Sequence, residues 1–203
     1  MSFSKNVNFM IEPSYYKNIE GWFDWENLYS DLLLNKLPDY STIVEIGVWK
    51  GKSLCYLSEL ALLNNKIVKI YGVDIFSNEL DNLNKPYCPD KNMASPIYFE
   101  CLVHLKNIGA LGSVAVPLVM FSNIASFLFN NNSIDCVFID GSHDEQSVIQ
   151  DLDYWVPKVK VGGYVCGHDY IDGIKPIIDK YFKEKFNSEV ETVLPHCFSY
   201  QKK

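Results

Sequence analysis

The fold is decided by the stretch Ile43-Val44-Glu45-Ile46-Gly47-Val48-Trp49-Lys50-Gly51-Lys52-Ser53. An apolar run carries an acidic residue, ends in a glycine-containing turn, and is followed by an amphipathic stretch. A second apolar run, Ile70-Tyr71-Gly72-Val73, closes on Asp74. In open α/β sheets, ligands bind outside the carboxyl ends of parallel strands. The two runs therefore predict neighbouring parallel strands with a nucleoside pocket at their carboxyl ends.

Working outward from this stretch, apolar periods of helix and strand alternate along the chain. The patterns predict strands over 43–47, 67–74, 114–121, 135–140, 164–167, 190–194 and 197–201. They predict helices over 24–37, 52–63, 96–108, 123–129, 143–156 and 172–186. This order is typical of a three-layer, Rossmann-like, doubly wound α/β sheet. The last two strands have no helix between them, which predicts a hairpin and an antiparallel edge.

Side chains that cap helices mark three of the predicted starts. Asp24 precedes the first helix, and Asp172 precedes the last. Ser142, with Glu145 three residues later, has the spacing of a capping box.

Length and composition bound the class of protein. The chain has 203 residues, 48% of them hydrophobic, which predicts a single domain over 1–203 with one sizeable core. Residues 1–20 are interpreted as an N-terminal extension. The polar stretch 77–95 carries two prolines and no period, and it is interpreted as a lid-like loop.

Charge, cysteine usage and terminal sequence indicate the setting. The net charge of −7 disfavours a nucleic-acid partner, which needs a basic face. The amino terminus lacks the apolar core of a signal peptide, and no apolar run is long enough for a membrane span. We therefore expect no membrane partner. None of the six cysteines forms a C-x-x-C pair, so we expect reduced thiols in a cytoplasmic protein.

The glycine loop admits three interpretations. A P-loop NTPase needs four residues between its glycine and the Gly-Lys-Ser end, whereas only three separate Gly47 from Gly51. The dinucleotide fingerprint would need a small residue where Trp49 stands. The third interpretation is an adenosyl cofactor without phosphates. Asp74 would accept the ribose hydroxyls, the helix start at Lys52-Ser53 would meet a carboxylate, and Glu45 would favour a cation. Those features together describe S-adenosylmethionine.

Two further strands end in polar clusters, Asp140-Gly141-Ser142-His143 and Gly167-His168-Asp169-Tyr170. We expect both clusters at the same sheet edge as Glu45 and Asp74. His143 is a candidate general base for a hydroxyl acceptor. Alternatively, a divalent cation held by Asp140 and Asp169 would lower the acceptor's pKa. Each side chain could also serve only as a helix cap or a polar strand end.

These motifs resemble the class I S-adenosylmethionine-dependent methyltransferases, and among them the macrocin O-methyltransferase-like subfamily. The resemblance rests on Val44–Ser53, Phe138–His143, Asp151–Pro157 and Gly162–Tyr170. It implies about seven strands with an antiparallel last strand, and a base at His143. Asp140 is the second candidate catalytic residue. In the metal-dependent members it implies Mg2+ at the positions of Asp140, His168 and Asp169. The implied cofactor-binding residues are Glu45, Gly47, Gly51, Ser53 and Asp74, with Ser122 and Asn123 near the adenine. Val48, Trp49 and Asp140 are further candidates for cofactor binding.

The sequence thus predicts an enzyme that methylates a hydroxyl of a small polar acceptor, a sugar or a phenol, from S-adenosylmethionine. Histidine, metal or both would assist. A cofactor-binding module without turnover is the main alternative, followed by a P-loop-like NTPase. The predicted partner is the small-molecule acceptor, with a homo-oligomer as a further expectation.

Overall fold

The computed structural model describes residues 13–77 and 96–203. The predicted lid-like loop therefore lies outside the described residues, except for Ser77. The predicted N-terminal extension is described only from Pro13, where it forms the short helix η1 (Tyr15–Asn18).

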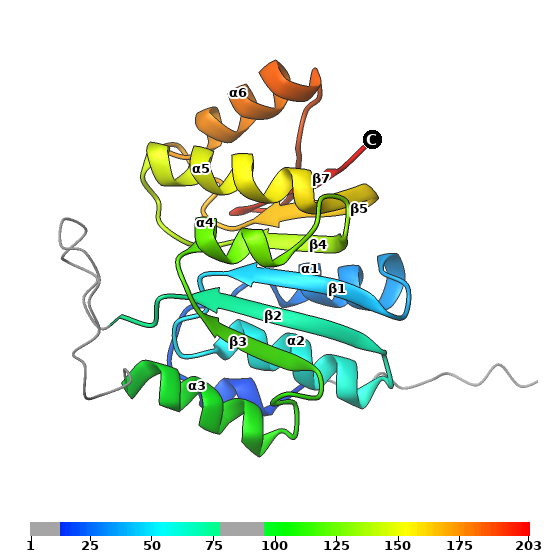
Figure 1. Cartoon of the computed structure of the whole chain (residues 1–203), viewed down its shortest axis with the longest axis vertical. Coiled ribbons are helices and arrows are strands. Elements are labelled where there is room, and N and C mark those ends of the chain that lie inside the picture. Colours follow the sequence, from blue (N-terminus) through cyan, green and yellow to red (C-terminus); the bar gives the residue numbers. More distant parts are fainter. Residues whose placement is uncertain (1–12, 78–95) are drawn as a thin grey trace, which may run out of the picture.

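One seven-stranded sheet runs through the molecule in the order β3-β2-β1-β4-β5-β7-β6 (Figure 1). Its parallel part comprises β1 (Ser41–Ile46), β2 (Val68–Asp74), β3 (Ala115–Val119), β4 (Ile134–Ile139) and β5 (Val159–Gly167). The last strands are β6 (Glu191–Leu194) and β7 (Cys197–Gln201), and β7 pairs antiparallel with both β5 and β6. The predicted fold class and the antiparallel end are confirmed.

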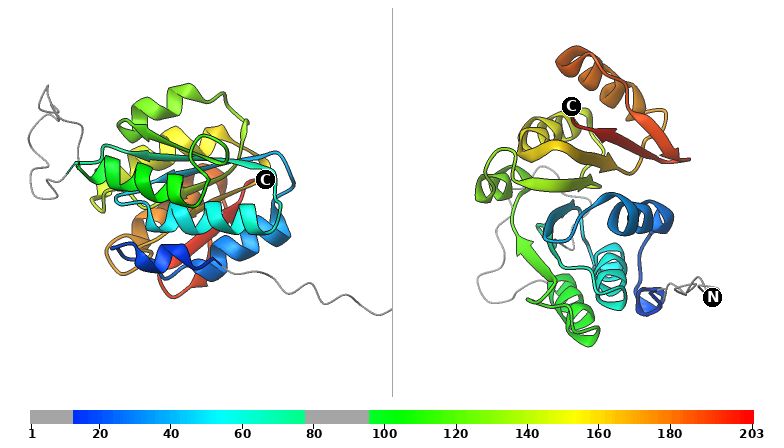
Figure 2. Two further views of the ribbon diagram at one scale, coloured as in Figure 1. Left: turned by 90° about the horizontal axis from the view of Figure 1, so that it is seen from below. Right: turned by 90° about the vertical axis from the view of Figure 1, so that its right-hand side faces the viewer.

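Helices cover both faces of the sheet, which gives the three predicted layers (Figure 2). One face carries α1 (Glu26–Asp31), the π-helical turn η2 (Leu32–Lys36), α2 (Lys52–Leu63) and α3 (Pro96–Asn107). The other carries α4 (Ser122–Ala125), η3 (Ser126–Leu128), α5 (Glu145–Trp155), η4 (Val156–Lys158) and α6 (Lys175–Phe186). Each face has its own hydrophobic cluster, because side chains alternate across a strand.

The central strands are buried on both sides, as expected for parallel strands between helical layers. Val44 and Phe138, for example, are fully buried on opposite faces. The register pairs Ile46 with Val73 and with Ile139, so β1, β2 and β4 reach the same edge together. The polar residues that follow these strands are thereby brought to one place.

The three predicted helix caps are wrong. The first helix begins at Glu26 after Trp25, without a side-chain cap. The last begins at Lys175 after Ile174, also without one. For α5 the cap is Asp144, whose carboxylate accepts the amide hydrogen of Ser147 at 2.9 Å, and Ser142 donates to Asp144 instead. A helix cap has an extended backbone just before the first helical residue, and Asp144, rather than Ser142, has that conformation.

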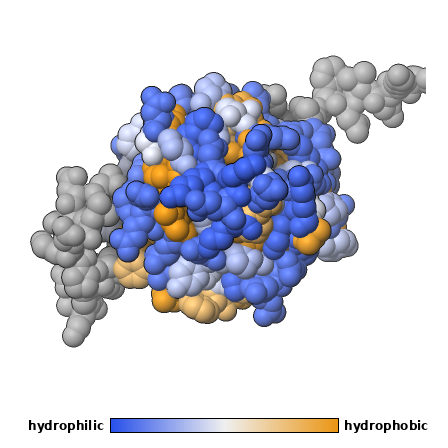
Figure 3. All heavy atoms as spheres, turned by 90° about the horizontal axis from the view of Figure 1, so that it is seen from above, coloured by the Kyte–Doolittle hydropathy of each residue, from blue (hydrophilic) through white to orange (hydrophobic). Residues whose placement is uncertain are grey.

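The side of the molecule on which α6 lies is mostly hydrophilic, with hydrophobic residues in small separate groups (Figure 3). The described cysteines, Cys55, Cys101, Cys136, Cys166 and Cys197, are free and buried. Over residues 13–77 and 96–203, no helix combines the length and apolar character that crossing a bilayer requires.

Candidate active site

The glycine loop between β1 and α2 follows the path that its sequence requires. Gly47 has a φ of 86°, and a Cβ there would lie 1.8 Å from the carbonyl oxygen of Asp140. Gly51, also at φ 86°, precedes α2, and a Cβ there would lie 2.8 Å from Sγ of Cys101. Only glycine fits both positions, because the conformation and the close neighbours exclude a side chain. The loop therefore runs directly beside the end of β4.

Asp74 holds this loop in place from the end of β2. Its Oδ2 accepts the backbone amides of Val48 at 2.7 Å and Trp49 at 2.8 Å. Its Oδ1 accepts the amide of Phe76 at 2.6 Å. A carboxylate that accepts backbone amides is a strong acceptor, so Asp74 fixes the loop at a negatively charged point. A phosphate on the same amides would meet this charge, which disfavours the NTPase alternative.

Glu45 lies inside the core beneath the loop rather than at its surface. The side chain is buried, and it accepts hydrogen bonds from Ser53 at 2.5 Å and from Tyr29 at 3.0 Å. Burial raises the pKa of Glu45 to about 8, although both hydrogen bonds oppose the shift. Glu45 thus links α1, β1 and α2, and its contact with a cofactor remains a prediction.

Ser122 and Asn123, which are predicted to contact the adenine, are the first two residues of α4. The Ser122 hydroxyl donates to Asp151 at 2.5 Å and accepts from the indole of Trp155 at 2.7 Å, so it faces α5. Burial raises the pKa of Asp151 to about 6. Asn123 accepts the amide of Ile124 at 2.9 Å and is half-buried. An adenine contact of either residue remains a prediction.

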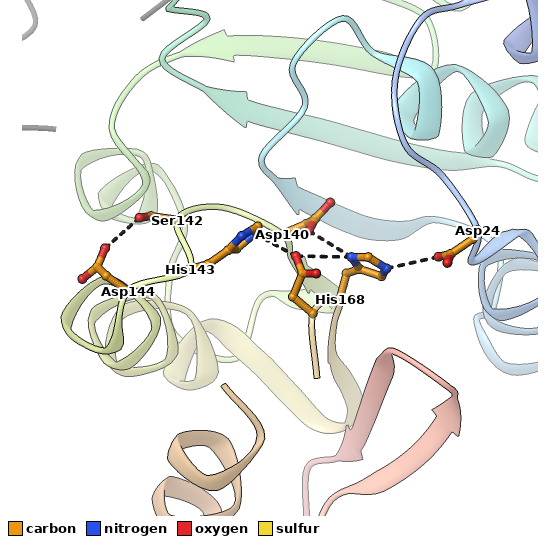
Figure 4. Close-up of polar contacts among 7 residues, drawn as sticks. Asp24, Asp140, Ser142, His143, Asp144 and His168 are labelled. Carbon is orange, nitrogen blue, oxygen red and sulfur yellow. Dashed lines mark hydrogen bonds and ion pairs between the residues drawn. The ribbon is translucent and has the colours of Figure 1, made fainter. Parts of the chain in front are cut away.

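The polar ends of β4 and β5 meet as the sequence predicts. His143 Nε2 lies 2.8 Å from Asp169 Oδ2. His168 Nδ1 lies 3.4 Å from the same oxygen and 3.6 Å from Asp140 Oδ1. Figure 4 shows His143 and Asp140, from the loop after β4, lying close to His168 from the end of β5. Asp169 adopts a left-handed φ of 51°, a region that aspartate tolerates better than most residues.

Asp24, in the N-terminal segment, completes the cluster, whereas the sequence predicted it only as a helix cap. Asp24 Oδ1 lies 3.1 Å from Nε2 of His168 (Figure 4). The Trp25 ring packs on His168 with centroids 4.5 Å apart and stacks on Phe138. Further along the segment, Trp22 stacks on Trp49 of the glycine loop. The N-terminal segment thus reaches from the glycine loop to the end of β5. No local sequence pattern around Asp24 predicts this placement.

The surrounding carboxylates control the charge of His168. Burial lowers its pKa, but the ion pairs with Asp140, Asp169 and Asp24 outweigh burial and raise it to about 9. Burial raises the pKa of Asp140, and His168 partly offsets this. At neutral pH His168 is therefore a cation between carboxylates.

Three side chains have the geometry to hold a metal ion. Asp140, His143 and Asp169 each offer one ligand atom, and these atoms lie within 4.8 Å of one another. Two carboxylate oxygens and one imidazole fit a divalent cation, and the imidazole suits a transition metal better than magnesium. His168 Nε2 is directed to Asp24, while its Nδ1 faces Asp140 and Asp169, so its predicted role as a metal ligand remains a prediction.

Sequence comparison supports one family. The model of the methyltransferase domain family (Methyltransf_24) matches residues 44–170, which span the glycine loop and both polar strand ends. An uncharacterized protein of Acanthamoeba polyphaga mimivirus is 30% identical over 136 residues, which is 66% of this chain. The chain spans about half (53%) of the length of that curated relative.

Solved structures share the fold at low identity. The O-methyltransferase NovP aligns with a TM-score of 0.59 at 22% identity, covering 87% of this chain and 77% of NovP. A putative methyltransferase from Streptococcus mutans, solved in complex with SAH, aligns with a TM-score of 0.58 at 11% identity, covering 88% and 97% of the two chains. CalS11, a TDP-rhamnose 3'-O-methyltransferase, aligns with a TM-score of 0.59 at 14% identity, covering 87% and 76%.

Proposed function

The chain belongs to the methyltransferase domain family, with the fold of class I S-adenosylmethionine-dependent methyltransferases, and we propose that it methylates a hydroxyl group of a small polar acceptor. The observation that carries the proposal is the His143–Asp169 pair, 2.8 Å apart, at the sheet edge that also holds the glycine loop. Two of the fold neighbours, NovP and CalS11, are described as O-methyltransferases. The macrocin O-methyltransferase-like subfamily remains part of the proposal.

The chain's own residues would hold the methyl donor at the loop. Gly47 and Gly51 let the backbone approach a ligand closely, because neither carries a side chain. Asp74 lies at the end of β2, where this proposal places the ribose. Val48 and Trp49, whose amides donate to Asp74, would lie next to the same site. The amino end of α2 at Ser53 adds the positive end of a helix dipole, which suits the carboxylate of S-adenosylmethionine.

His143 would act as the general base. With the Nε2 proton directed to Asp169, 2.8 Å away, Nδ1 would be unprotonated and could take the proton of an acceptor hydroxyl. The oxygen would then attack the methyl carbon in line with the departing sulfur, and positioning of the two reactants supplies much of the rate. The His143 side chain is 57% exposed, so an acceptor can reach it from solvent.

A divalent cation is compatible with this arrangement. Asp140, His143 and Asp169 would hold it, and its charge would lower the pKa of an acceptor hydroxyl. In that case His143 is a ligand rather than the base. The two roles of His143 exclude each other, so metal dependence of turnover separates them.

Isothermal titration with S-adenosylmethionine and SAH tests the cofactor. We expect saturable binding of both, and no heat at millimolar ligand would overturn the proposal. Turnover is then measured as SAH release in the presence of phenolic and sugar acceptors, with and without EDTA. Cofactor binding without turnover of any acceptor would favour the binding module, and saturable ATP binding would favour the NTPase.

A further inference from the structure

A hollow of about 320 Å³ opens next to the His143–Asp169 pair, between the start of α5 and the loop that joins β5 to α6. Its lining residues are His143, Glu145, Asp169, Ile171, Gly173, Ile174 and Ile177. His143, Asp169 and Ile174 also line the smaller cavity that contains Asp140 and His168. The hollow thus adjoins the polar cluster.

The two sides of the hollow differ in chemistry. His143, Glu145 and Asp169 provide polar groups, whereas Ile171, Ile174 and Ile177 form an apolar wall. Ligand sites commonly combine an apolar wall with a few convergent polar groups. A ring with hydroxyl groups on one edge and an apolar face matches both sides. The volume lies at the small end of the usual range of roughly 300–1,000 Å³, so it suits a single ring.

The charge of the lining residues also limits the charge of a ligand that can bind in the hollow. Glu145 and Asp169 are acidic, and among the residues that the structure describes no lysine lines the hollow. The sequence contains no arginine, the residue best suited to bind phosphate with two hydrogen bonds. An anionic group in the hollow would therefore face two carboxylates. The nearby cation His168 lines the smaller cavity rather than the hollow, and it is already paired with Asp140, Asp169 and Asp24.

We propose that this hollow is the acceptor site, and that it selects a neutral or cationic hydroxylated single ring and rejects anionic acceptors such as nucleotide-linked sugars. The inference rests on the proposed function, because it gives the acceptor of that reaction its place and chemical class. Ile171, Ile174, Ile177 and Glu145 become specificity-determining residues, and the acceptor hydroxyl would lie on the His143 side.

The test follows the isoleucine methyl groups by NMR in protein saturated with SAH. The probes are 4-ethylcatechol, dopamine and 3,4-dihydroxyphenylacetate, which share a ring and differ in charge, together with methyl rhamnoside as a neutral sugar. We expect the neutral or cationic probes to shift the Ile171, Ile174 and Ile177 methyls. The anionic probe should bind roughly tenfold more weakly than 4-ethylcatechol, as expected for one nearby unscreened charge.

A variant that fills the hollow provides the second arm. A Cβ at Gly173 would meet nothing within 4 Å, and its φ is not in the left-handed region, so Gly173→Phe can be accommodated. We expect this variant to lose probe binding and to keep SAH binding. Val161→Phe adds the same ring at an exposed position near the start of β5, the opposite end of the strand, and should retain both.

The outcomes separate the two proposals. If the unmodified protein does not bind SAH, the proposed function itself is wrong. Intact SAH binding, with no shift of the three methyls by any neutral or cationic probe, would overturn the acceptor site alone. Equal binding of the anionic probe, or probe binding that survives Gly173→Phe, would also overturn it.

Discussion

Asp24 and His168 are 144 residues apart in the sequence, yet Oδ1 of Asp24 lies 3.1 Å from Nε2 of His168. The contact joins the segment before α1 to the end of β5. It also makes Asp24 one of the three carboxylates that hold His168 protonated. A residue with the sequence signature of a helix cap is thereby part of the candidate active site.

Asp24→Asn should lower the pKa of His168 from about 9 toward its ordinary value of 6.5, because one of its stabilising charges is lost. A raised histidine pKa stabilises the fold fully below pH 6.5, and this contribution is lost as pH rises through about 9. The destabilisation caused by the variant should therefore be largest in acid and vanish above pH 9. Imidazole NMR and urea unfolding in EDTA measure both quantities. Asp31→Asn, which removes a half-exposed carboxylate of α1 paired with Lys36, is the control for the His168 titration. An unchanged His168 titration in Asp24→Asn would contradict the prediction.

Glu45→Gln should change how stability depends on pH. The folded pKa is about 8 against an ordinary 4.5, so between these values the folded state holds a proton that the unfolded state has released. The free energy of unfolding of the unmodified protein should accordingly fall with rising pH in this window. Relative to Glu45→Gln, we expect a loss on the order of 1–3 kcal/mol between pH 5 and pH 7. The prediction is refuted if the free energy of unfolding from urea curves changes equally in the two proteins between pH 5 and pH 7. Glu184→Gln, exposed on α6, is the matched control.

Asp74→Ala should loosen the glycine loop. Three backbone amides, those of Val48, Trp49 and Phe76, lose their acceptor. Because water can reach this partly buried site, we expect a moderate loss of about 2 kcal/mol in the free energy of unfolding. Titration calorimetry should show weaker SAH binding as well. Asp39→Ala, which removes a single exposed amide contact to Ile67, should cost clearly less. Equal costs for the two variants would show that Asp74 does not brace the loop.

Gly47→Ala should destabilise the protein strongly. The added carbon would lie 1.8 Å from a backbone oxygen at a φ of 86°, so the strands β1 and β4 must separate locally. We expect a loss of at least ~3 kcal/mol in the free energy of unfolding. Gly173→Ala is the matched control, because nothing lies within 4 Å of its added carbon. Thermal unfolding of both variants measures the difference, and similar midpoints would disprove the close approach.

Local sequence identified most elements, and particular residues show where it failed. The helix 52–63 was predicted with its observed bounds, because a glycine turn precedes it and an apolar stripe runs along it. The strand predicted over 164–167 begins at Val159 instead. Residues 159–163 contain Gly162-Gly163, a turn signal in isolation, but pairing of Ile134 with Val159 extends the ladder. Strand length depends on a partner, which a local pattern does not contain.

The sequence by itself determined the doubly wound sheet and the edge at which its polar residues collect. Alternating apolar periods specify each element, and parallel strands must end on a common side. Only the tertiary structure decided which groups touch there. The burial of Glu45 against Tyr29, the bracing of Trp49 by Asp74 and the pairing of Asp24 with His168 all depend on packing between distant segments. Such contacts are set by the relative placement of whole helices and strands, which no short stretch of residues encodes.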